Sequence, residues 1–255
     1  MPKTRSLLST LRLGFTLAEA RFRIRNAGSY LGIFWYLLEP LVFFIIIILI
    51  QGNLGIKPIE NYQAYVLLGL IMVNFFVNAM TGAIRSIRDN RYLVKSINLD
   101  LEALPLSVVI QFCFSHFFEF LLFIIFILYY HSFSWTIIFY PLIFIVFAIF
   151  MIGLAFIAAS LGAFIEDFDN IWIVFSRVLW LATPIFYALT PGTFLYKINL
   201  FNPLYYLINI GRQIVIYDSF PGFTPILTTL VLSFATFGLG RGIFARSKKK
   251  FIEFL

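Results

Sequence analysis

The sequence RFRIRNAGSYLGIFWYLLEP, residues 21–40, joins a basic stretch to a long apolar one. Arg21, Arg23 and Arg25 stand near its start, and the uncharged run LVFFIIIILI follows directly after Pro40. A helix of about 20 apolar residues crosses the roughly 30 Å hydrocarbon core of a bilayer. The stretch therefore predicts a cationic helix on a membrane surface that turns into the first of several spans.

The composition predicts an all-α integral membrane protein with a single domain. Of the 255 residues, 61% are hydrophobic and only 12% are charged, whereas soluble domains carry about 25% charged residues. Long apolar runs exclude a membrane β-barrel, whose strands alternate apolar and polar residues. The single Cys113 leaves no disulfide framework or zinc cluster to expect. Arg12 and Glu19 interrupt the apolar core that a cleaved signal peptide would need.

Residues 1–27 predict an amphipathic helix that lies in the membrane interface. Apolar and charged side chains fall on different sides of this helix at about 100° per residue. The apolar stripe holds Leu7, Leu8, Leu11, Phe15, Ala18 and Phe22, and the charged one holds Arg5, Arg12, Glu19 and Arg23. The apolar runs that follow predict six spans, over residues 31–50, 62–83, 106–130, 137–164, 172–187 and 223–240.

Two stretches between the spans have other predicted structures. Residues 85–104 are too polar to cross a membrane and predict a short helix on one membrane face. Residues 188–222 are apolar but interrupted, most clearly at Pro191-Gly192 and Asn202-Pro203. This second stretch predicts short re-entrant helices before the last span, which are tolerated only where protein or water covers their backbone.

The distribution of basic residues predicts which side of the membrane each loop occupies. Six spans put both termini on one side, together with residues 85–104. That side collects fifteen of the 19 Lys and Arg residues, and the other side holds only Lys57, Lys197 and Arg212. By the positive-inside rule the basic side is cytoplasmic. The sequence thus predicts a multi-pass protein of the cytoplasmic (inner) membrane, with a charge of +7 that reports topology and does not indicate nucleic-acid binding.

The motifs of common enzymes are missing from the sequence. It has no G-x-x-x-x-G-K-[ST] phosphate loop, no H-E-x-x-H and no G-x-S-x-G. Four ionisable residues fall inside predicted spans: Glu39, His116, Glu119 and Arg177. A proton-coupled carrier usually has more of them, with a repeat between its halves. We therefore expect no catalytic site and no cofactor in this chain, and a conduit whose energy comes from another subunit.

Two small polar clusters invite a functional interpretation. His116 and Glu119 lie one helical turn apart, as half of a metal site or a proton relay would, but the spacing favours a hydrogen-bonded pair buried between helices. The acidic loop 166–171, EDFDNI, lacks the glycine turn and the distal glutamate of a calcium loop. We interpret it as a solvated helix cap.

Several stretches, in order along the chain, resemble the type-2 ABC exporter permeases for polysaccharides, and most closely those that export O-antigen or capsule-type polysaccharide. RFRIRNAGSYLGIFWYLLEP resembles their entry signature, and DNRYLVKSINLDLEALPLS their cytoplasmic stretch before the third span. GAFIEDFDNI resembles the turn after the fourth span, although Glu166-Asp167 stands where an Arg-Asp pair is commoner. LWLATPIFY and NPLYYLINIGRQIV resemble the fifth span and the outer re-entrant segment.

This resemblance implies an assembly and a path for the substrate. Two copies of the chain would pair around the path, and two separate ATPase subunits, which bind ATP and Mg²⁺, would dock on the cytoplasmic side. A lipid-linked polysaccharide would cross from the cytoplasm to the periplasm. Residues 85–104 would hold the coupling helix, with contacts through Arg88, Asp89, Asn90 and Tyr92. Residues 188–222 would form the outer gate, with breaks at Pro191, Gly192, Asn202 and Pro203.

The resemblance also suggests which side chains meet the substrate. Arg21, Arg23 and Arg25 are candidates for the lipid pyrophosphate, since guanidinium groups match phosphate oxygens; anchoring to anionic lipid is the alternative. Five aromatic residues are candidates for stacking on sugars, against ordinary membrane packing: Trp35, Tyr36, Trp180, Phe186 and Tyr187. There are two kinds of alternative function. The chain could be a permease of the same type for teichoic acid or for a small lipophilic compound, or it could be an ion-coupled carrier.

Overall fold

The protein is a bundle of helices in the computed structural model, which describes residues 7–27, 32, 34–53, 59–96, 100–130 and 134–251. Every regular element in these residues is helical. The helices are α1 (Leu7–Asn26), α2 (Phe34–Ile50), η1 (Gln51–Asn53), α3 (Tyr62–Arg85), η2 (Arg88–Asn90), α4 (Arg91–Ser96), α5 (Ala103–Tyr129), η3 (Trp135–Phe139), α6 (Tyr140–Phe164), α7 (Phe168–Ala182), α8 (Phe194–Asn199), α9 (Pro203–Val215) and α10 (Phe223–Ser247).

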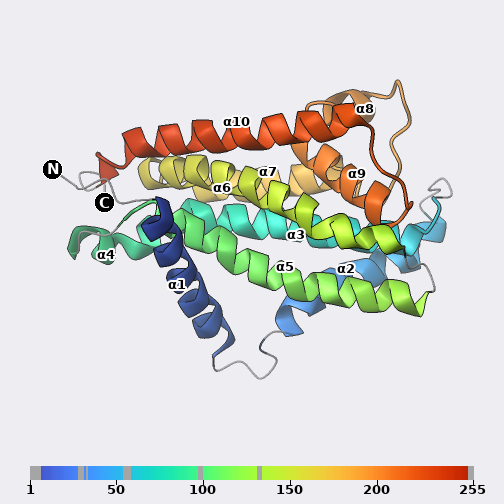
Figure 1. Cartoon of the computed structure of the whole chain (residues 1–255), viewed down its shortest axis with the longest axis horizontal. Helices are drawn as coiled ribbons and strands as arrows, with labels where there is room; N and C mark the ends of the chain where they lie inside the picture. The colour runs from blue at the N-terminus through green and yellow to red at the C-terminus, as the bar shows by residue number, and fades with distance from the viewer. Residues whose placement is uncertain are drawn as a thin grey trace.

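Helix α3 is the centre of the bundle. It contacts α2, α5, α6, α7 and α9, while α10 packs along α6 and α1 crosses the first half of α5 (Figure 1). Helix α3 is mostly apolar, and its side chains are buried over most of its length. Its polar residues Asn74, Asn78, Thr81 and Arg85 follow one another at helical spacing on one side. The wide apolar surface that remains suits a helix in the interior of the bundle.

The all-α membrane fold expected from the sequence is confirmed. Four segments are long and apolar enough to cross a membrane: α3, α5, Trp135–Phe164 and α10. Helix α2 is apolar but has only 17 residues. Each predicted span corresponds to a helix, and the largest shift is in α7, which covers Phe168–Ala182 where residues 172–187 were predicted. Helix α7 ends early because Thr183 precedes Pro184 and adopts an extended conformation.

The two ends of the described chain meet at one end of the bundle (Figure 1). The Thr10 hydroxyl of α1 donates to the Asp100 carboxylate. The neighbouring Glu102 accepts hydrogen bonds from Arg241 Nε of α10 at 3.3 Å and from Nζ of Lys248, the residue directly after α10, at 2.6 Å. We call this the basic end, because α4, η2 and the last turns of α10 bring their Lys and Arg residues here. The shared location of both ends agrees with an even number of crossings.

Helix α1 presents two different faces. Thr10, Gly14 and Ala18 are buried against α5, where a side chain on Gly14 would come within 2.9 Å of Leu106 Cδ2. Part of the predicted apolar stripe points away from the protein instead: Leu8, Leu11 and Phe15 are exposed. An apolar face that the protein leaves uncovered suits a helix lying in the membrane interface.

Helices α6 and α10 approach each other until their backbones touch. A Cβ atom on Gly240 would collide with the carbonyl group of Gly153, and one on Gly153 would come within 2.5 Å of Phe237 N. Small residues allow such close contact between membrane helices, where van der Waals packing replaces the hydrophobic effect as the driving force. This contact fixes the otherwise exposed α10 on the bundle.

We predict that Gly240→Ala lowers the stability of the protein, while Gly238→Ala does not. A Cβ at position 238 meets nothing within 4 Å, and both positions lie in α10, so the gain in helix propensity is the same. Overpacking against a backbone costs about 1–3 kcal/mol. Thermal unfolding of the purified variants in detergent measures the difference. Equal melting temperatures would contradict the packing argument.

Candidate functional site

The segment 85–96 at the basic end presents an exposed surface, and we call it the coupling segment. Asp89, Arg91, Tyr92 and Lys95 are exposed, with Tyr92 at 72%, and the Arg91 guanidinium lies 5.1 Å from the Tyr92 ring. Of the four residues predicted for the ATPase contact, Asp89 and Tyr92 are therefore accessible. Asn90 donates through Nδ2 to Ser86 O at 2.7 Å and so ties the turn together.

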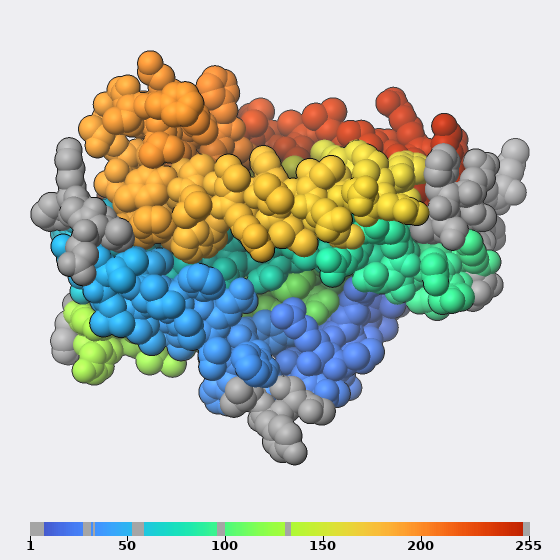
Figure 2. All heavy atoms as spheres, turned by 180° about the vertical axis from the view of Figure 1, so that it is seen from behind, coloured from blue at the N-terminus to red at the C-terminus, as the bar shows by residue number. Residues whose placement is uncertain are grey.

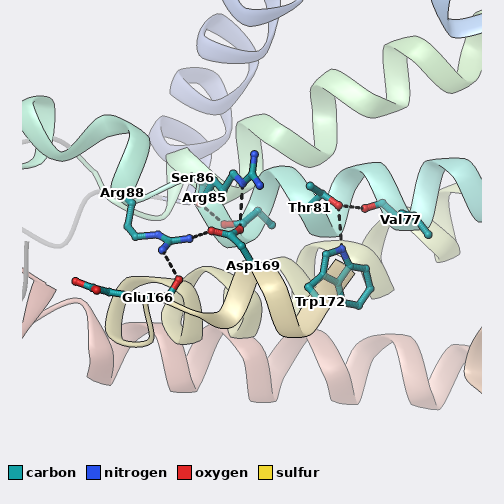
Figure 3. A network of polar contacts seen from close by, with 9 residues as sticks. Val77, Thr81, Arg85, Ser86, Arg88, Glu166, Asp169 and Trp172 are labelled. Carbon is teal, nitrogen blue, oxygen red and sulfur yellow. Dashed lines mark hydrogen bonds and ion pairs between the residues drawn. The ribbon is translucent and has the colours of Figure 1, made fainter. Parts of the chain in front are cut away.

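The fourth residue, Arg88, points into the protein and joins a polar network between α3 and α7 (Figure 3). Its guanidinium donates to the Asp169 carboxylate and, at 2.9 Å, to Glu166 O. Arg85 Nε donates to the other Asp169 oxygen at 3.0 Å. One turn further along, Trp172 Nε1 donates to Thr81 Oγ1 at 2.9 Å. Arg88 thus attaches the coupling segment to α7 and to the turn before it, and its guanidinium has few free donors for an ATPase subunit.

The carboxylates of the acidic turn between α6 and α7 lie in two different environments. Glu166 and Asp167 have exposed side chains, as expected for a solvated cap. Asp169 departs from that interpretation, since it is held by Arg85 and Arg88. No group of three or more His, Cys, Asp or Glu residues in the described part of the chain is placed to hold a metal ion.

The three candidate head-group arginines point in different directions. Arg23 is exposed and pairs with Glu19 at 2.6 Å on the same helix. Arg21 is partly buried, and burial lowers its pKa while the nearby Asp89 carboxylate raises it. Arg25 lies 4.6 Å from the centre of the Tyr36 ring and 5.4 Å from that of Phe112. Arg25 also lines a cavity among the described residues.

That cavity, of about 520 Å³, lies between the end of α1 and the start of α2. Its lining is mostly apolar and includes Arg25, Trp35, Tyr36 and Glu39. The Tyr36 hydroxyl is buried and has no hydrogen-bond partner among the described residues. The cavity therefore offers a cation, a carboxylate, an amide and an exposed indole to a ligand, from Arg25, Glu39, Asn26 and Trp35.

The remaining candidate aromatic residues form one continuous row. Phe43 of α2 lies 5.7 Å from Trp180 of α7, which lies 5.7 Å from Phe186, and Phe186 lies 5.3 Å from Tyr187. Because Phe43 also lines the cavity, the row begins where the cavity ends. The structure thus brings the two groups of predicted sugar-stacking residues onto adjoining surfaces.

The predicted outer gate consists of α8, α9 and their connections, at the end of the bundle opposite the basic end (Figure 1). Pro191 and Gly192 lie in an exposed turn, where Gly192 has a φ of +87° that favours glycine. Asn202 caps α9 by accepting from Leu204 N at 3.1 Å, and Pro203 occupies the first turn. Asn202 Nδ2 also donates to Thr183 Oγ1 at 3.0 Å. The Asn202-Pro203 break is therefore the capped start of α9, bonded to Thr183 at the end of α7.

A buried arginine on α9 holds the irregular backbone after α7. Arg212 is 1% exposed and donates to Pro184 O at 2.7 Å, Ile185 O at 2.9 Å and Tyr65 O at 3.1 Å. Its guanidinium lies 3.3 Å from the centre of the Tyr65 ring. The Tyr65 and Tyr62 hydroxyls donate to Tyr187 O and Phe186 O. We call this group the arginine latch.

The arginine latch supplies hydrogen-bond donors to backbone carbonyl groups that lie outside a helix. Carbonyl groups that leave a helix inside a membrane need internal donors, because lipid supplies none. The guanidinium group fits beside α3 only because residue 69 is glycine: a Cβ there would lie 2.5 Å from Arg212 Nη2. The sequence interpretation counted Arg212 among the outer loop charges, whereas the structure places it in the interior.

The intramembrane pair His116 and Glu119 is buried, as the sequence suggested. The predicted hydrogen bond within the pair is not formed: His116 Nδ1 lies 3.5 Å from Glu119 Oε2 without a hydrogen bond, and the ring bonds through Nε2 with the Tyr140 hydroxyl at 2.8 Å instead. The ring also stacks on Phe144 at 4.1 Å. Arg177, in contrast, is exposed on α7. The pair belongs to the packed core between α5 and α6.

Sequence reasoning missed three residues that hold the site together: Asp169, Arg212 and Gly69. Asp169 was considered only as part of an acidic loop, and Arg212 only as a charge. The available signal was an arginine inside an apolar helix, because such a residue must find acceptors within the protein.

Comparisons with known proteins agree on one family. The family model described as "ABC-2 type transporter" matches residues 13–216. The chain is 22% identical over 253 residues to the O-antigen export system permease protein RfbA of Myxococcus xanthus, covering 98% of this chain and 97% of that protein. It is 27% and 26% identical to two proteins of the same name from Klebsiella pneumoniae, each covering 91% of both chains.

We predict that Arg212→Lys and Gly69→Ala each destabilise the protein. A lysine cannot reach all of the carbonyl groups, and hydrogen bonds from a charged donor are worth about 1.5–3 kcal/mol each. A methyl group at position 69 displaces the guanidinium at a cost of about 1–3 kcal/mol. Thermal unfolding in detergent tests both, with the exposed Arg177→Lys as the control. Unchanged stability of Arg212→Lys would contradict the latch.

Proposed function

The chain belongs to the ABC-2 type transporter family, and from this membership we propose that it is the membrane-spanning permease subunit of an ABC exporter. The substrate would be a lipid-linked polysaccharide of the O-antigen type, moved from the cytoplasm to the periplasm. The hydrolysis of ATP, with its Mg²⁺, would take place in a separate subunit, so this chain is a transporter subunit and not an enzyme.

One observation carries this proposal: the similarity to the permeases covers most of the chain and most of each relative. The family model spans residues 13–216, and the three relatives named for O-antigen export align over at least 91% of both chains. Such coverage favours one shared architecture and not a shared fragment. The fold supports it, with four long apolar helices and a basic end.

A second copy of the chain would complete the path. Figure 2 shows the face where α7 (yellow) and α2 (light blue) lie on either side of α3 (cyan to green). Both helices expose large apolar side chains, and the exposed ones on α7 are Ile171, Ile173, Val174, Phe175, Val178 and Leu181. A second copy facing α2 and α7 would enclose the aromatic row between the two protomers.

The ATPase subunits would dock at the basic end, which the positive-inside rule assigns to the cytoplasm. The coupling segment supplies the contact through Asp89, Arg91 and Tyr92, which are all exposed. Two ATPase subunits would correspond to two permease copies. Both termini of the chain would lie on this side of the inner membrane.

The lipid-linked head group would enter at the cavity between α1 and α2. The Arg25 guanidinium can bind phosphate oxygens in a bidentate manner. The exposed Trp35 indole, with the Tyr36 ring beside it in the lining, would meet the first sugars. The row through Phe43, Trp180 and Phe186 then gives the glycan a continuous aromatic surface toward the outer gate.

Reconstitution of the chain with its ATPase in liposomes tests the proposed function. Lipid-linked glycan should cross the membrane only when ATP is hydrolysed. Transport of the same substrate without the ATPase would overturn the proposal in favour of an ion-coupled carrier. Transport of teichoic acid or of a lipophilic compound, but not of the glycan, would retain the family and replace the substrate.

We predict that Arg25→Ala lowers glycan transport by about tenfold, the loss expected for one charged hydrogen bond, while Arg23→Ala leaves it unchanged. The two residues lie two positions apart on α1, but only Arg25 lines the cavity, and Arg23 points outward to Glu19. The measurement is the initial rate of ATP-dependent transport in liposomes. Equal rates for the two variants would show that the head group binds elsewhere.

We predict that Tyr92→Ala weakens binding of the ATPase subunit by about tenfold, because exposed aromatic residues often dominate an interface. Tyr129 is the matched control, since it is 78% exposed at the opposite end of the bundle. Affinity between the detergent-purified subunits measures the effect. A loss with Tyr129→Ala, or no loss with Tyr92→Ala, would contradict the docking surface.

A further inference from the structure

The hydrogen bonds and ion pairs between α3 and α7, which we call the polar ties, come from two sets of side chains, one on each helix. Thr81, Arg85 and Arg88 follow at spacings of four and three residues, so they lie on one side of α3 and η2. Asp169 and Trp172, three residues apart, lie on one side of α7. Each tie joins one set to the other (Figure 3). The two helices are therefore attached over a full helical turn at the basic end.

Asp169 carries the ionic part of this attachment alone. One oxygen accepts from Arg85 and the other from Arg88, so a single carboxylate serves two guanidinium groups. The side chains of Asp169 and Arg88 are 20% and 25% exposed, while that of Arg85 is 47% exposed. An isolated exposed ion pair contributes little, but the loss of a shared and partly buried carboxylate leaves two cations without an anionic partner, and Arg88 then keeps only its bond to Glu166 O.

Apolar packing alone holds α7 weakly. Trp172 is its only fully buried residue in the described structure, Leu179 and Trp180 are partly buried against the core, and most of its other apolar side chains are exposed. The polar ties at its first turns therefore determine how α7 moves when the end of α3 moves. Arg88, in turn, belongs to the same continuous turn as the exposed Asp89 and Tyr92.

We propose that Asp169 is the positioning residue through which the coupling segment moves α7. The inference rests on the proposed function, in which the ATPase pushes on Asp89, Arg91 and Tyr92. A displacement of η2 carries Arg88 with it, and the Asp169 carboxylate transmits it to the first turn of α7. Helix α7 has 15 residues and, at 1.5 Å per residue, reaches about 22 Å toward Thr183 and the aromatic row. Asp169 touches neither nucleotide nor glycan in this role.

The test compares Asp169→Asn with Asp167→Asn in liposomes that contain the chain and its ATPase. Asn keeps the size of the side chain and removes the charge. Asp167 lies in the same turn, is exposed and has no bond to either arginine, so it controls for loss of a carboxylate. We expect Asp169→Asn to bind the ATPase and hydrolyse ATP, with glycan transported per ATP at least about tenfold lower. The Asp167→Asn variant should keep the wild-type ratio.

A double-mutant cycle keeps the inference testable if Asp169→Asn alone folds poorly. Arg88→Gln should lower the transport-to-ATP ratio as Asp169→Asn does, and the combined variant, which leaves only the half-exposed Arg85 without its carboxylate, should lose no more than either one. Asp169→Glu, which keeps the carboxylate, should recover part of the ratio. Additive losses, or a wild-type ratio in the combined variant, would overturn the inference.

The same experiment separates this inference from the proposed function. If the wild-type complex shows no ATP-dependent glycan transport, the proposed function fails, and the role of Asp169 fails with it. If the wild-type complex transports glycan and Asp169→Asn keeps the full ratio, the function stands and only the role of Asp169 is wrong. Trp172→Phe removes the neighbouring bond to Thr81 and should keep at least half of the ratio. A larger loss would assign the coupling to the whole contact between α3 and α7 and overturn the specific role of Asp169.

Discussion

Helix α7 is held by polar bonds at its two ends, and the arrangement of the predicted substrate path depends on this constraint. At the basic end Asp169 accepts from Arg85 and Arg88. Beyond the other end Arg212 donates to Pro184 O and Ile185 O. Between membrane helices the hydrophobic effect provides little attraction, because lipid is as apolar as the side chains it replaces. The polar bonds therefore set the position of a helix that exposes most of its apolar surface.

The fold was largely predictable from the sequence because it follows from hydropathy alone. The predicted span 62–83 is α3, Tyr62–Arg85, and the span at 106–130 is α5, Ala103–Tyr129. Both are long apolar runs bounded by charge or proline, so periodicity and length suffice. The prediction was least accurate for α7, whose first turn carries Asp169 and Asn170. The polar sequence of a first helical turn looks like that of a loop as long as the residues it bonds to are unknown.

The sequence was enough to predict which residue types form the site, but not which residues they bond to. Arg25, Trp35 and Tyr36 were chosen for their chemistry, and the structure gathers them around one cavity. Arg88 was chosen as a surface contact, but it bonds to Asp169, 81 positions away in the chain. Arg212 and Tyr65 are 147 positions apart. A single sequence records which residues are charged, whereas only the packing of the helices decides which acceptor each charge meets.

The two attachments of α7 differ in how easily they rearrange. The Asp169 bonds lie at the basic end, where the side chains keep some contact with water, so the bonded groups can move together while water solvates the surface that they uncover. The latch is buried, and moving Arg212 away would leave a charge and several carbonyl groups unpaired in an apolar medium. A push on the coupling segment should therefore displace the first turn of α7 while its far end stays fixed to α3 and α9. Helix α7 would then tilt about the latch, and Trp180, near that far end, would move less than Asp169. Small displacements near the latch are enough to change the spacing of an aromatic row whose neighbouring rings lie 5.7 Å apart.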